Sequence, residues 1–267
     1  MTAALAEPTR LDVPSPPVAR RRAARRLRAM RARTGLRLVD AAARLDMSTS
    51  ALHRLETGET LANVHVVRSM MDLYDHYSPN LLDLVRTSRS QGWWRAYGVF
   101  DDYIGWETDA AQMCEVATTR IPDLLQVDDY ARATGSDGRA LSVLKARQSR
   151  LTVLRLNVVI SEAVITHDVP GVDLRAQIAH LSRQSELSTV AIRVLPAAET
   201  ARMQPTPLRL LDYPHPDPCV AFVDSALGRT QTDELRDTVA VRRTFESIAA
   251  AAMTPRETRD FLSRINR

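Results

Sequence analysis

The N-terminal fold is decided by the stretch GLRLVDAAARLDMSTSALHRLETGET, residues 35–60. Its apolar residues recur at helical spacing, first within 38–45 and again within 52–55. Between these segments Met47 can plug a core, and Ser48 can cap the second helix by accepting a hydrogen bond from a backbone N–H. The pattern therefore predicts two short helices joined by a tight turn.

The second of these helices carries a polar outer face, which consists of Thr49, Ser50, His53 and Arg54. A short, capped helix that is polar on one face and braced by a first helix has the dimensions to enter a DNA major groove. We therefore interpret these four residues as candidates for reading base edges.

The stretch resembles the helix-turn-helix of the Xre/Cro-like repressor family. The resemblance rests on a small residue at the helix crossing, an apolar set and a characteristic ending: Ala42; Leu45, Met47, Leu52 and Leu55; and LETGET at 55–60. It implies that Thr49, Ser50 and Arg54 read bases. It further implies phosphate contacts from Ser48 and Thr60 and a structural ion pair between Arg31 and Glu56.

Two positions depart from the family pattern. Asp46 stands where the turn often has Gly, and Asp tolerates a left-handed backbone better than most residues. Leu38 stands where many members have a phosphate-binding Gln, and an alkyl side chain cannot donate to phosphate. We assign that anchoring task to Arg37.

The Arg-rich segment before this stretch predicts a helix over 19–34, ended by Gly35. Arg20, Arg21, Arg25, Arg28 and Arg33 would lie on its solvated side. Such a run of Arg residues can form a solvated helix face with no further role. Beside a helix-turn-helix it can instead contact DNA phosphates, which releases counterions, and Arg28 is the candidate for such a contact. Residues 1–18 are rich in Pro and are expected to form a flexible leader.

Further helices are expected over 63–74 and 78–89, so residues 19–90 form an all-α domain of five helices. Charge follows this division. Residues 1–90 hold 15 Arg against 9 acidic residues, net +6, while 91–267 hold 21 basic against 23 acidic residues, net −2. Positive potential on the N-terminal domain alone is expected if only that domain meets a polyanion.

Composition argues against several protein classes. The apolar runs are too short for a membrane span or a signal peptide, so a cytoplasmic protein is expected. Cys114 and Cys219 have no metal-spaced partner and are interpreted as small apolar residues. The sequence has no nucleotide-binding, nucleophile-elbow or zinc motif, so we expect no cofactor, no metal and no enzymatic activity. A catalytic site assembled from residues far apart in the sequence would not be detected by such motifs.

Residues 91–267 are expected to form an α+β domain with a small mixed sheet, because helical and strand-like segments do not alternate regularly. We expect helices over 124–134, 142–155 and 173–185, strands over 156–165, 189–195, 208–213 and 219–224, a helix capped by Thr232 that runs to 252, and a final helix opened by the capping box Thr254-Pro255-Arg256-Glu257. The helix after Thr232 is a candidate dimerisation surface.

An aromatic cluster at 93–106 marks the junction of the two domains. Four of its residues could form a ligand pocket or an interface: Trp93, Trp94, Tyr97 and Trp106. The alternative is that they pack the linker onto the second domain, which is the more common role of buried aromatic residues.

A second resemblance covers about 92–264. The motifs that carry it include Trp93-Trp94, Ile121-Pro122-Asp123-Leu124-Leu125-Gln126, Arg147-Gln148, Ser161-Glu162-Ala163 and Val194-Leu195-Pro196. They look like the uncharacterised C-terminal domain of two-domain actinobacterial regulators, which are similar to antitoxin-like transcription factors and often sit beside a gene for a small partner protein. Asp123 and Val127 replace the Gly and Thr that are usual in that pattern.

The leading hypothesis is a sequence-specific transcriptional regulator that binds a near-palindromic operator in double-stranded DNA as a homodimer. One alternative is an antitoxin-like module that holds a small partner protein and uses DNA binding for autoregulation. Another is a regulator that responds to a small molecule, whose identity the sequence does not indicate.

Overall fold

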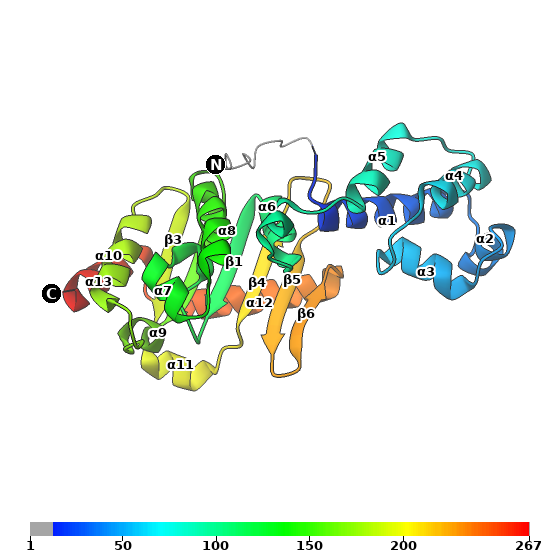
Figure 1. The fold of residues 1–267 in the computed structure, drawn as a ribbon. Helices are drawn as coiled ribbons and strands as arrows, with labels where there is room; N and C mark the ends of the chain where they lie inside the picture. The colour runs from blue at the N-terminus through cyan, green and yellow to red at the C-terminus, as the bar shows by residue number, and fades with distance from the viewer. Residues whose placement is uncertain (1–12, 267) are drawn as a thin grey trace, which may run out of the picture. The chain divides into compact units, whose positions relative to one another are not determined.

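The computed structural model of the chain describes residues 13–266 (Figure 1). These residues form two compact units, one comprising the chain up to Ala96 together with Phe100–Asp109, the other comprising Tyr97–Val99 and the chain from Ala110 onward. The first unit thus extends past residue 90, where the sequence-based boundary was placed. Residues 1–12 of the expected leader lie outside the described residues.

The first unit is helical, as expected. Its α-helices are α1 (Pro16–Arg33), α2 (Leu38–Arg44), α3 (Thr49–Thr57), α4 (Val64–Leu73), α5 (Pro79–Ser88) and α6 (Tyr103–Thr108). Helix α1 takes in residues 16–18 of the expected leader, because Pro16 suits the first helical turn and Ser15 is anchored. The backbone N–H and the hydroxyl of Ser15 both donate to Asp109 Oδ2, at 2.7 and 2.9 Å.

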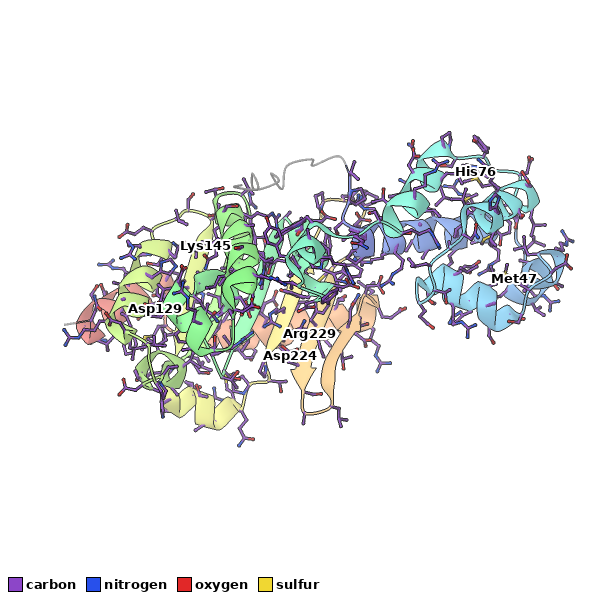
Figure 2. The ribbon with its side chains drawn as sticks, in the orientation of Figure 1. Met47, His76, Asp129, Lys145, Asp224 and Arg229 are labelled. Atoms are coloured by element: carbon purple, nitrogen blue, oxygen red, sulfur yellow. The ribbon has the colours of Figure 1, made fainter. Side chains whose placement is uncertain are left out.

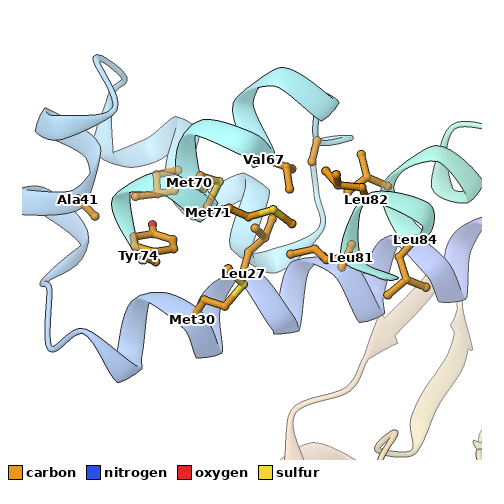
Figure 3. Close-up of a cluster of buried hydrophobic side chains, with 14 of the residues drawn as sticks. Leu27, Met30, Ala41, Val67, Met70, Met71, Tyr74, Leu81, Leu82 and Leu84 are labelled. Carbon is orange, nitrogen blue, oxygen red and sulfur yellow. The ribbon is translucent and has the colours of Figure 1, made fainter. Parts of the chain in front are cut away.

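The five predicted helices α1 to α5 enclose one apolar core (Figure 3). Leu27 of α1, Met70 of α4 and Leu81 of α5 are completely buried at its centre. Leu52 brings α3 into the same core and is likewise fully buried. The recognition helix is therefore held by the packing of its inner face, which leaves its outer face available.

Helix α6 was not predicted and joins the first unit through Trp94, whose side chain is 1% exposed. Two glycines permit this packing. A Cβ on Gly105 of α6 would lie 2.5 Å from the Trp94 ring and 2.6 Å from Pro17 Cγ, and one on Gly92 would lie 2.3 Å from the same ring. The indole thus lies directly against backbone, and Gly105 sets how closely α6 approaches α1.

The second unit is built on a six-stranded mixed sheet within the described chain, in the order β3-β2-β1-β4-β5-β6. Strands β1, β2 and β3 are parallel, while β4, β5 and β6 continue the sheet antiparallel from β1. The strands are β1 (Gln112–Ala117), β2 (Arg155–Ser161), β3 (Val190–Leu195), β4 (Leu208–Asp212), β5 (Val220–Ser225) and β6 (Gly228–Thr232). The predicted α+β class with a mixed sheet is confirmed.

Helices cover both faces of this sheet. Cys114, Val159 and Leu210 form an apolar layer with Phe245 and Ile248 of the long helix α12 on one face. The opposite face carries the helical segments between β1 and β2 (Figure 1). The helices of this unit are α7 (Asp128–Ala133), α8 (Gly138–Gln148), α9 (Glu162–Thr166), α10 (Leu174–Gln184), α11 (Ala197–Met203), α12 (Leu235–Ala251) and α13 (Pro255–Ile265), with 3-10 turns η1 (Trp93–Tyr97), η2 (Asp123–Leu125) and η3 (Ser149–Thr152).

Four predicted elements of the second unit were wrong in part. The helix expected over 142–155 instead runs from Gly138 to Gln148, is followed by η3, and gives way to β2 at Arg155. The helix expected over 124–134 is divided into η2 and α7, because the extended backbone of Gln126 and Val127 interrupts it. The strand expected over 156–165 ends at Ser161, where α9 begins. Thr232 ends β6 rather than capping α12, and its hydroxyl accepts the Glu234 N–H at 3.2 Å.

The predicted capping box at the start of α13 is confirmed. The Thr254 hydroxyl accepts the Glu257 N–H at 3.3 Å, and the Glu257 carboxylate accepts the Thr254 N–H at 2.8 Å. This cap lies next to the outer edge of β3. There Met253 N–H donates to the Val194 carbonyl at 2.9 Å, and Val194 N–H donates to the Thr258 hydroxyl at 3.1 Å.

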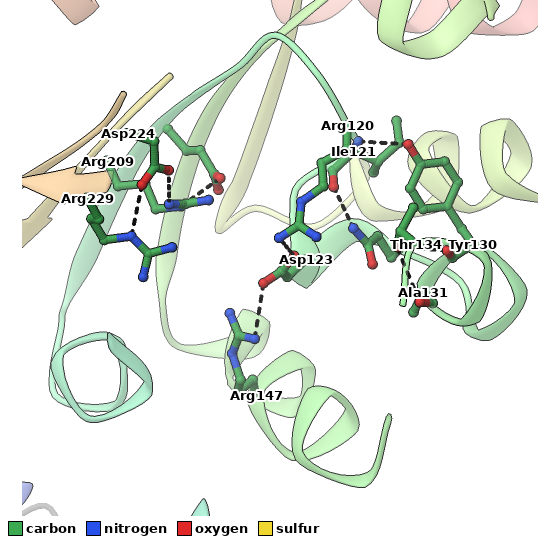
Figure 4. A network of polar contacts seen from close by, with 12 residues as sticks. Arg120, Ile121, Asp123, Tyr130, Ala131, Thr134, Arg147, Arg209, Asp224 and Arg229 are labelled. Carbon is green, nitrogen blue, oxygen red and sulfur yellow. Dashed lines mark hydrogen bonds and ion pairs between the residues drawn. The ribbon is translucent and has the colours of Figure 1, made fainter. Parts of the chain in front are cut away.

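Charged side chains form a network on the face of the sheet opposite α12 (Figure 4). Arg209 of β4 donates to Glu115 of β1 and to Asp224 of β5, each at 2.9 Å, and Asp224 also accepts from Arg229 at 2.9 Å. Glu115 is 4% exposed. A charge buried to this degree is tolerated because a guanidinium is hydrogen-bonded to it.

Asp123, which replaces the Gly usual at this position, belongs to a neighbouring cluster. Arg120 and Arg147 approach its carboxylate to 2.9 and 3.3 Å. Burial alone would raise the pKa of Asp123, but the charges of Arg147, Arg120 and Arg209 outweigh burial and hold this pKa below its usual range. Asp123 thus ties η2 to α8.

Replacing Asp123 by Asn should make the stability of the second unit less sensitive to acid. Because the Asp123 pKa is lower in the folded than in the unfolded chain, its stabilisation is complete above the usual carboxyl pKa of about 4 and is lost as pH falls through the lower folded value. Urea unfolding followed by circular dichroism at pH 7 and pH 3 tests this, with the exposed Asp129→Asn as control. An equal loss of stability on acidification in wild type and Asp123→Asn would contradict it.

Candidate nucleic-acid interface

The turn between α2 and α3 has the geometry that its sequence predicts. Asp46 adopts a left-handed backbone, with φ of 51°, where the family pattern often has Gly. Met47 N–H returns to the Ala42 carbonyl at 3.0 Å, and its side chain packs against the core (Figure 2). The Ser48 hydroxyl accepts the Ala51 N–H at 3.1 Å, which caps α3. The start of the recognition helix is therefore fixed.

The four candidate base-reading residues share one exposed face of α3. Thr49, Ser50, His53 and Arg54 are all exposed, while Leu52 on the opposite side is completely buried. Helix α3 ends at Thr57 and is capped by Gly58, which is left-handed with φ of 78°. The helix thus presents two hydroxyls, an imidazole and one long cation to the outside, which suits contact with base edges.

The candidate phosphate contacts surround this face but differ in their local bonding. Ser48 and Thr60 are exposed, and the Thr60 N–H donates to the Arg54 carbonyl at 3.1 Å. Arg28 of α1 is also exposed. Arg37 is engaged with Asp40 through two hydrogen bonds of 2.7 and 2.9 Å, which lower the Asp40 pKa. The Asp40 charge therefore offsets the positive charge that Arg37 presents.

Arg31 and Glu56 form the ion pair that the resemblance implied. Arg31 Nε and Nη2 donate to the two Glu56 carboxylate oxygens at 2.7 and 2.8 Å. Arg31 Nη1 also donates to the Leu36 carbonyl at 2.8 Å. The Glu56 side chain is 3% exposed and that of Arg31 is 16% exposed. One guanidinium thus joins α1, the segment just before α2 and the end of α3.

The predicted solvated face of α1 is wrong at one position. Arg25, Arg28 and Arg33 are exposed and Arg20 is half-buried. Arg21, in contrast, is 7% exposed, and its guanidinium lies 5.7 Å from the Trp106 ring centroid. Cation–π attraction and a hydrophobic stem make such burial tolerable. Sequence reasoning missed this contact because the helix that supplies Trp106 was not predicted.

The other aromatic candidates are divided between the two units. Trp94 and Trp106 are buried within the first unit, Trp93 is half-buried there, and Tyr97 belongs to the second unit. Trp94 Nε1 has no hydrogen-bond partner among the described residues. Trp94 also lines a groove of about 180 Å³, which is formed by Pro16, Pro17, Arg20, Leu61, Ser88, Arg89, Ser90, Gln91, Gly92, Trp94, Arg95 and Asp102.

Two family models match the chain. Residues 100–264, well over half of the sequence, match a family described as Domain of unknown function (DUF5753). The chain belongs to this family. Residues 22–85 match a model described as Helix-turn-helix domain, which spans α2, the turn and α3 and supports a DNA-binding regulator. No curated protein and no solved structure matches the chain.

Other kinds of site find little support in residues 13–266 of this DUF5753 protein. In that range no cluster of three His, Cys, Asp or Glu side chains is placed to hold a metal ion. The free thiol of Cys114 is buried and that of Cys219 half-buried, and burial raises the pKa of Cys219 to about 12. Within the same range, no helix has the length and apolar character that crossing a membrane requires.

Proposed function

We propose that this DUF5753 protein is a sequence-specific transcriptional regulator of the Xre/Cro-like type. The observation that carries the proposal is the capped helix α3, whose inner face is fixed by Leu52 and by the Glu56 ion pair while its outer polar face is exposed. On this proposal α3 enters the major groove and the protein acts in the cytoplasm without catalysing a reaction. Arg54 donates to a guanine edge, and Thr49 and Ser50 contact neighbouring bases.

The proposal includes a homodimer. One helix reaches too few base pairs to specify a genomic site, and the usual solution is two helices that read two half-sites about one turn of DNA apart. The second unit is then available to set the distance between the two helices. A near-palindromic operator is the expected target.

Replacing Arg54 by Ala should weaken operator binding by about 1 to 3 kcal/mol and relax specificity at one position of each half-site, because one bidentate base contact is lost. Fragment selection from genomic DNA with the wild-type protein would first define the operator. Binding to that operator and to its single-base variants would then be compared for wild type and Arg54→Ala.

Arg86→Ala is the matched control, since Arg86 is exposed on α5 and pairs with Asp83 of the same helix. It should leave the base preference unchanged. An Arg54→Ala protein that still discriminates every base as wild type does would remove Arg54 from the reading face. Failure of the wild-type protein to select any motif would overturn sequence-specific recognition itself.

A further inference from the structure

Strand β6 forms one edge of the sheet, and no other strand of the described chain pairs with its outer side. Its first four residues are exposed. In an antiparallel sheet, alternate residues of an edge strand direct their backbone N–H and C=O groups away from the neighbouring strand. Such an edge is a template for pairing with another strand.

The opposite edge of the same sheet, strand β3, is covered by other parts of the chain. At β3 the backbone N–H and C=O of Val194 are engaged by the Thr258 hydroxyl and by the Met253 N–H, so the start of α13 covers that edge. Strand β6 has no Pro or Lys, residues that commonly protect an edge from pairing, and its one charged residue, Arg229, donates to Asp224 of the neighbouring strand β5. The two edges therefore differ, and β6 is the one open to a further strand.

We propose that β6 pairs antiparallel with β6 of a second copy of this chain, so that two sheets join into one across a twofold axis at Gln231. In this register Arg229 of each copy lies opposite Asp233, the residue directly after β6, of the other. An axis at Arg229 would place two guanidinium groups opposite each other, and an axis at Thr230 would place Leu227 opposite the Asp233 carboxylate. Opposite charges stabilise cross-strand pairs and like charges destabilise them, so the charge pattern favours Gln231.

The apolar residues beside the strand follow the same symmetry. Leu227 at the tip of the β5–β6 hairpin is fully exposed, and Leu235 at the start of α12 is 77% exposed. With the axis at Gln231, the hairpin tip that carries Leu227 in one copy comes near the start of α12, which carries Leu235, in the other. Pairing would thus cover two large apolar side chains per copy that the chain alone leaves in water.

This inference rests on the proposed function, because it gives the homodimer its surface. It adds a specific contact that the DNA-binding proposal does not require, since two helices α3 could be brought together through another surface. The register can therefore be tested by itself.

Gln231→Cys provides the direct test. Residues on the twofold axis of an antiparallel pair have Cα atoms about 4.5 or 5.5 Å apart, which lies within the range of disulfides. Mild oxidation of the full-length variant should give a covalent dimer within minutes at micromolar concentration. Wild type controls for Cys114 and Cys219, and Thr244→Cys, exposed on α12 away from β6, controls for random collision.

Leu227→Lys provides an independent test that does not threaten folding, because the Leu227 side chain is fully exposed. Sedimentation equilibrium should show the dimer dissociation constant raised about fivefold or more, because a charge replaces an apolar side chain at both ends of the paired strands. Val153→Lys, an equally drastic change at another exposed apolar position, should leave that constant unchanged.

A dimer that forms no Gln231→Cys disulfide, or that cross-links no faster than Thr244→Cys, would overturn the β6 contact. A chain that stays monomeric in solution and on its operator would overturn it as well. Operator selection by the wild-type protein separates these results from the proposed function. If the protein selects a motif but does not cross-link through β6, the proposed regulator function is kept and only the β6 surface is excluded.

Discussion

Replacing Glu56 by Ala is expected to destabilise the first unit by about 3 kcal/mol and to abolish operator binding. The change leaves the Arg31 guanidinium, only 16% exposed, without its carboxylate partner beside Tyr74, a side chain whose hydroxyl has no partner among the described residues. Removing one partner of a buried ion pair destabilises the fold far more than replacing both partners by apolar residues, because an uncompensated charge remains. The end of α3 would lose its connection to α1.

Tryptophan fluorescence during urea unfolding measures this effect selectively, because all three Trp residues of the chain belong to the first unit. Glu59→Ala is the control, since Glu59 is exposed and its carboxylate accepts a hydrogen bond from the Thr57 hydroxyl at 3.0 Å. Replacing both partners, Arg31→Met with Glu56→Leu, should recover most of the lost stability. Equal stability of Glu56→Ala and wild type would show that the pair contributes nothing.

Replacing Arg209 by Met is expected to destabilise the second unit by about 3 to 5 kcal/mol. Glu115 would then be a carboxylate in the middle of the sheet, 4% exposed, that has lost the Arg209 guanidinium. The unfolded chain would solvate that charge fully, so the loss of the guanidinium destabilises the folded state. Tryptophan fluorescence should change little, whereas circular dichroism should report early unfolding of the second unit.

Arg229→Met is the matched control for this change. Arg229 is one-third exposed, and its partner Asp224 keeps a second hydrogen bond, to Arg209. Removing Arg229 should therefore cost about 1 kcal/mol or less. A larger loss for Arg229→Met than for Arg209→Met would contradict the assignment of Arg209 as the centre of the network.

The helix-turn-helix could be predicted in detail because its signals are local. The spacing of Leu52 and Leu55, the cap at Ser48 and the turn at Asp46 each depend on neighbours within a few residues. The resemblance added the pairing of Arg31 with Glu56, which spacing alone does not indicate. The roles of Thr49, Ser50, His53 and Arg54 at DNA remain predictions, since exposure alone does not show what they contact.

The missed elements depend on distant partners. Strand β1 lies at the centre of the sheet and is buried from both sides, so it lacks the alternating pattern that marks a half-exposed strand. Helix α6 is too short for a periodic signal and is held by Trp94 and Arg21. Strand β6 is polar and exposed, and only its register with β5 makes it a strand.

The central position of β1 also sets an order of events during synthesis. The helices of the first unit contact partners nearby in sequence, so that unit can fold soon after it leaves the ribosome. Strand β1 instead pairs with β4, where Gln112 meets Asp212 a hundred residues later. At ribosomal rates of about 5 to 20 residues per second, β1 waits at least several seconds for that partner. A growing chain therefore carries a folded recognition helix before its second unit can complete a sheet.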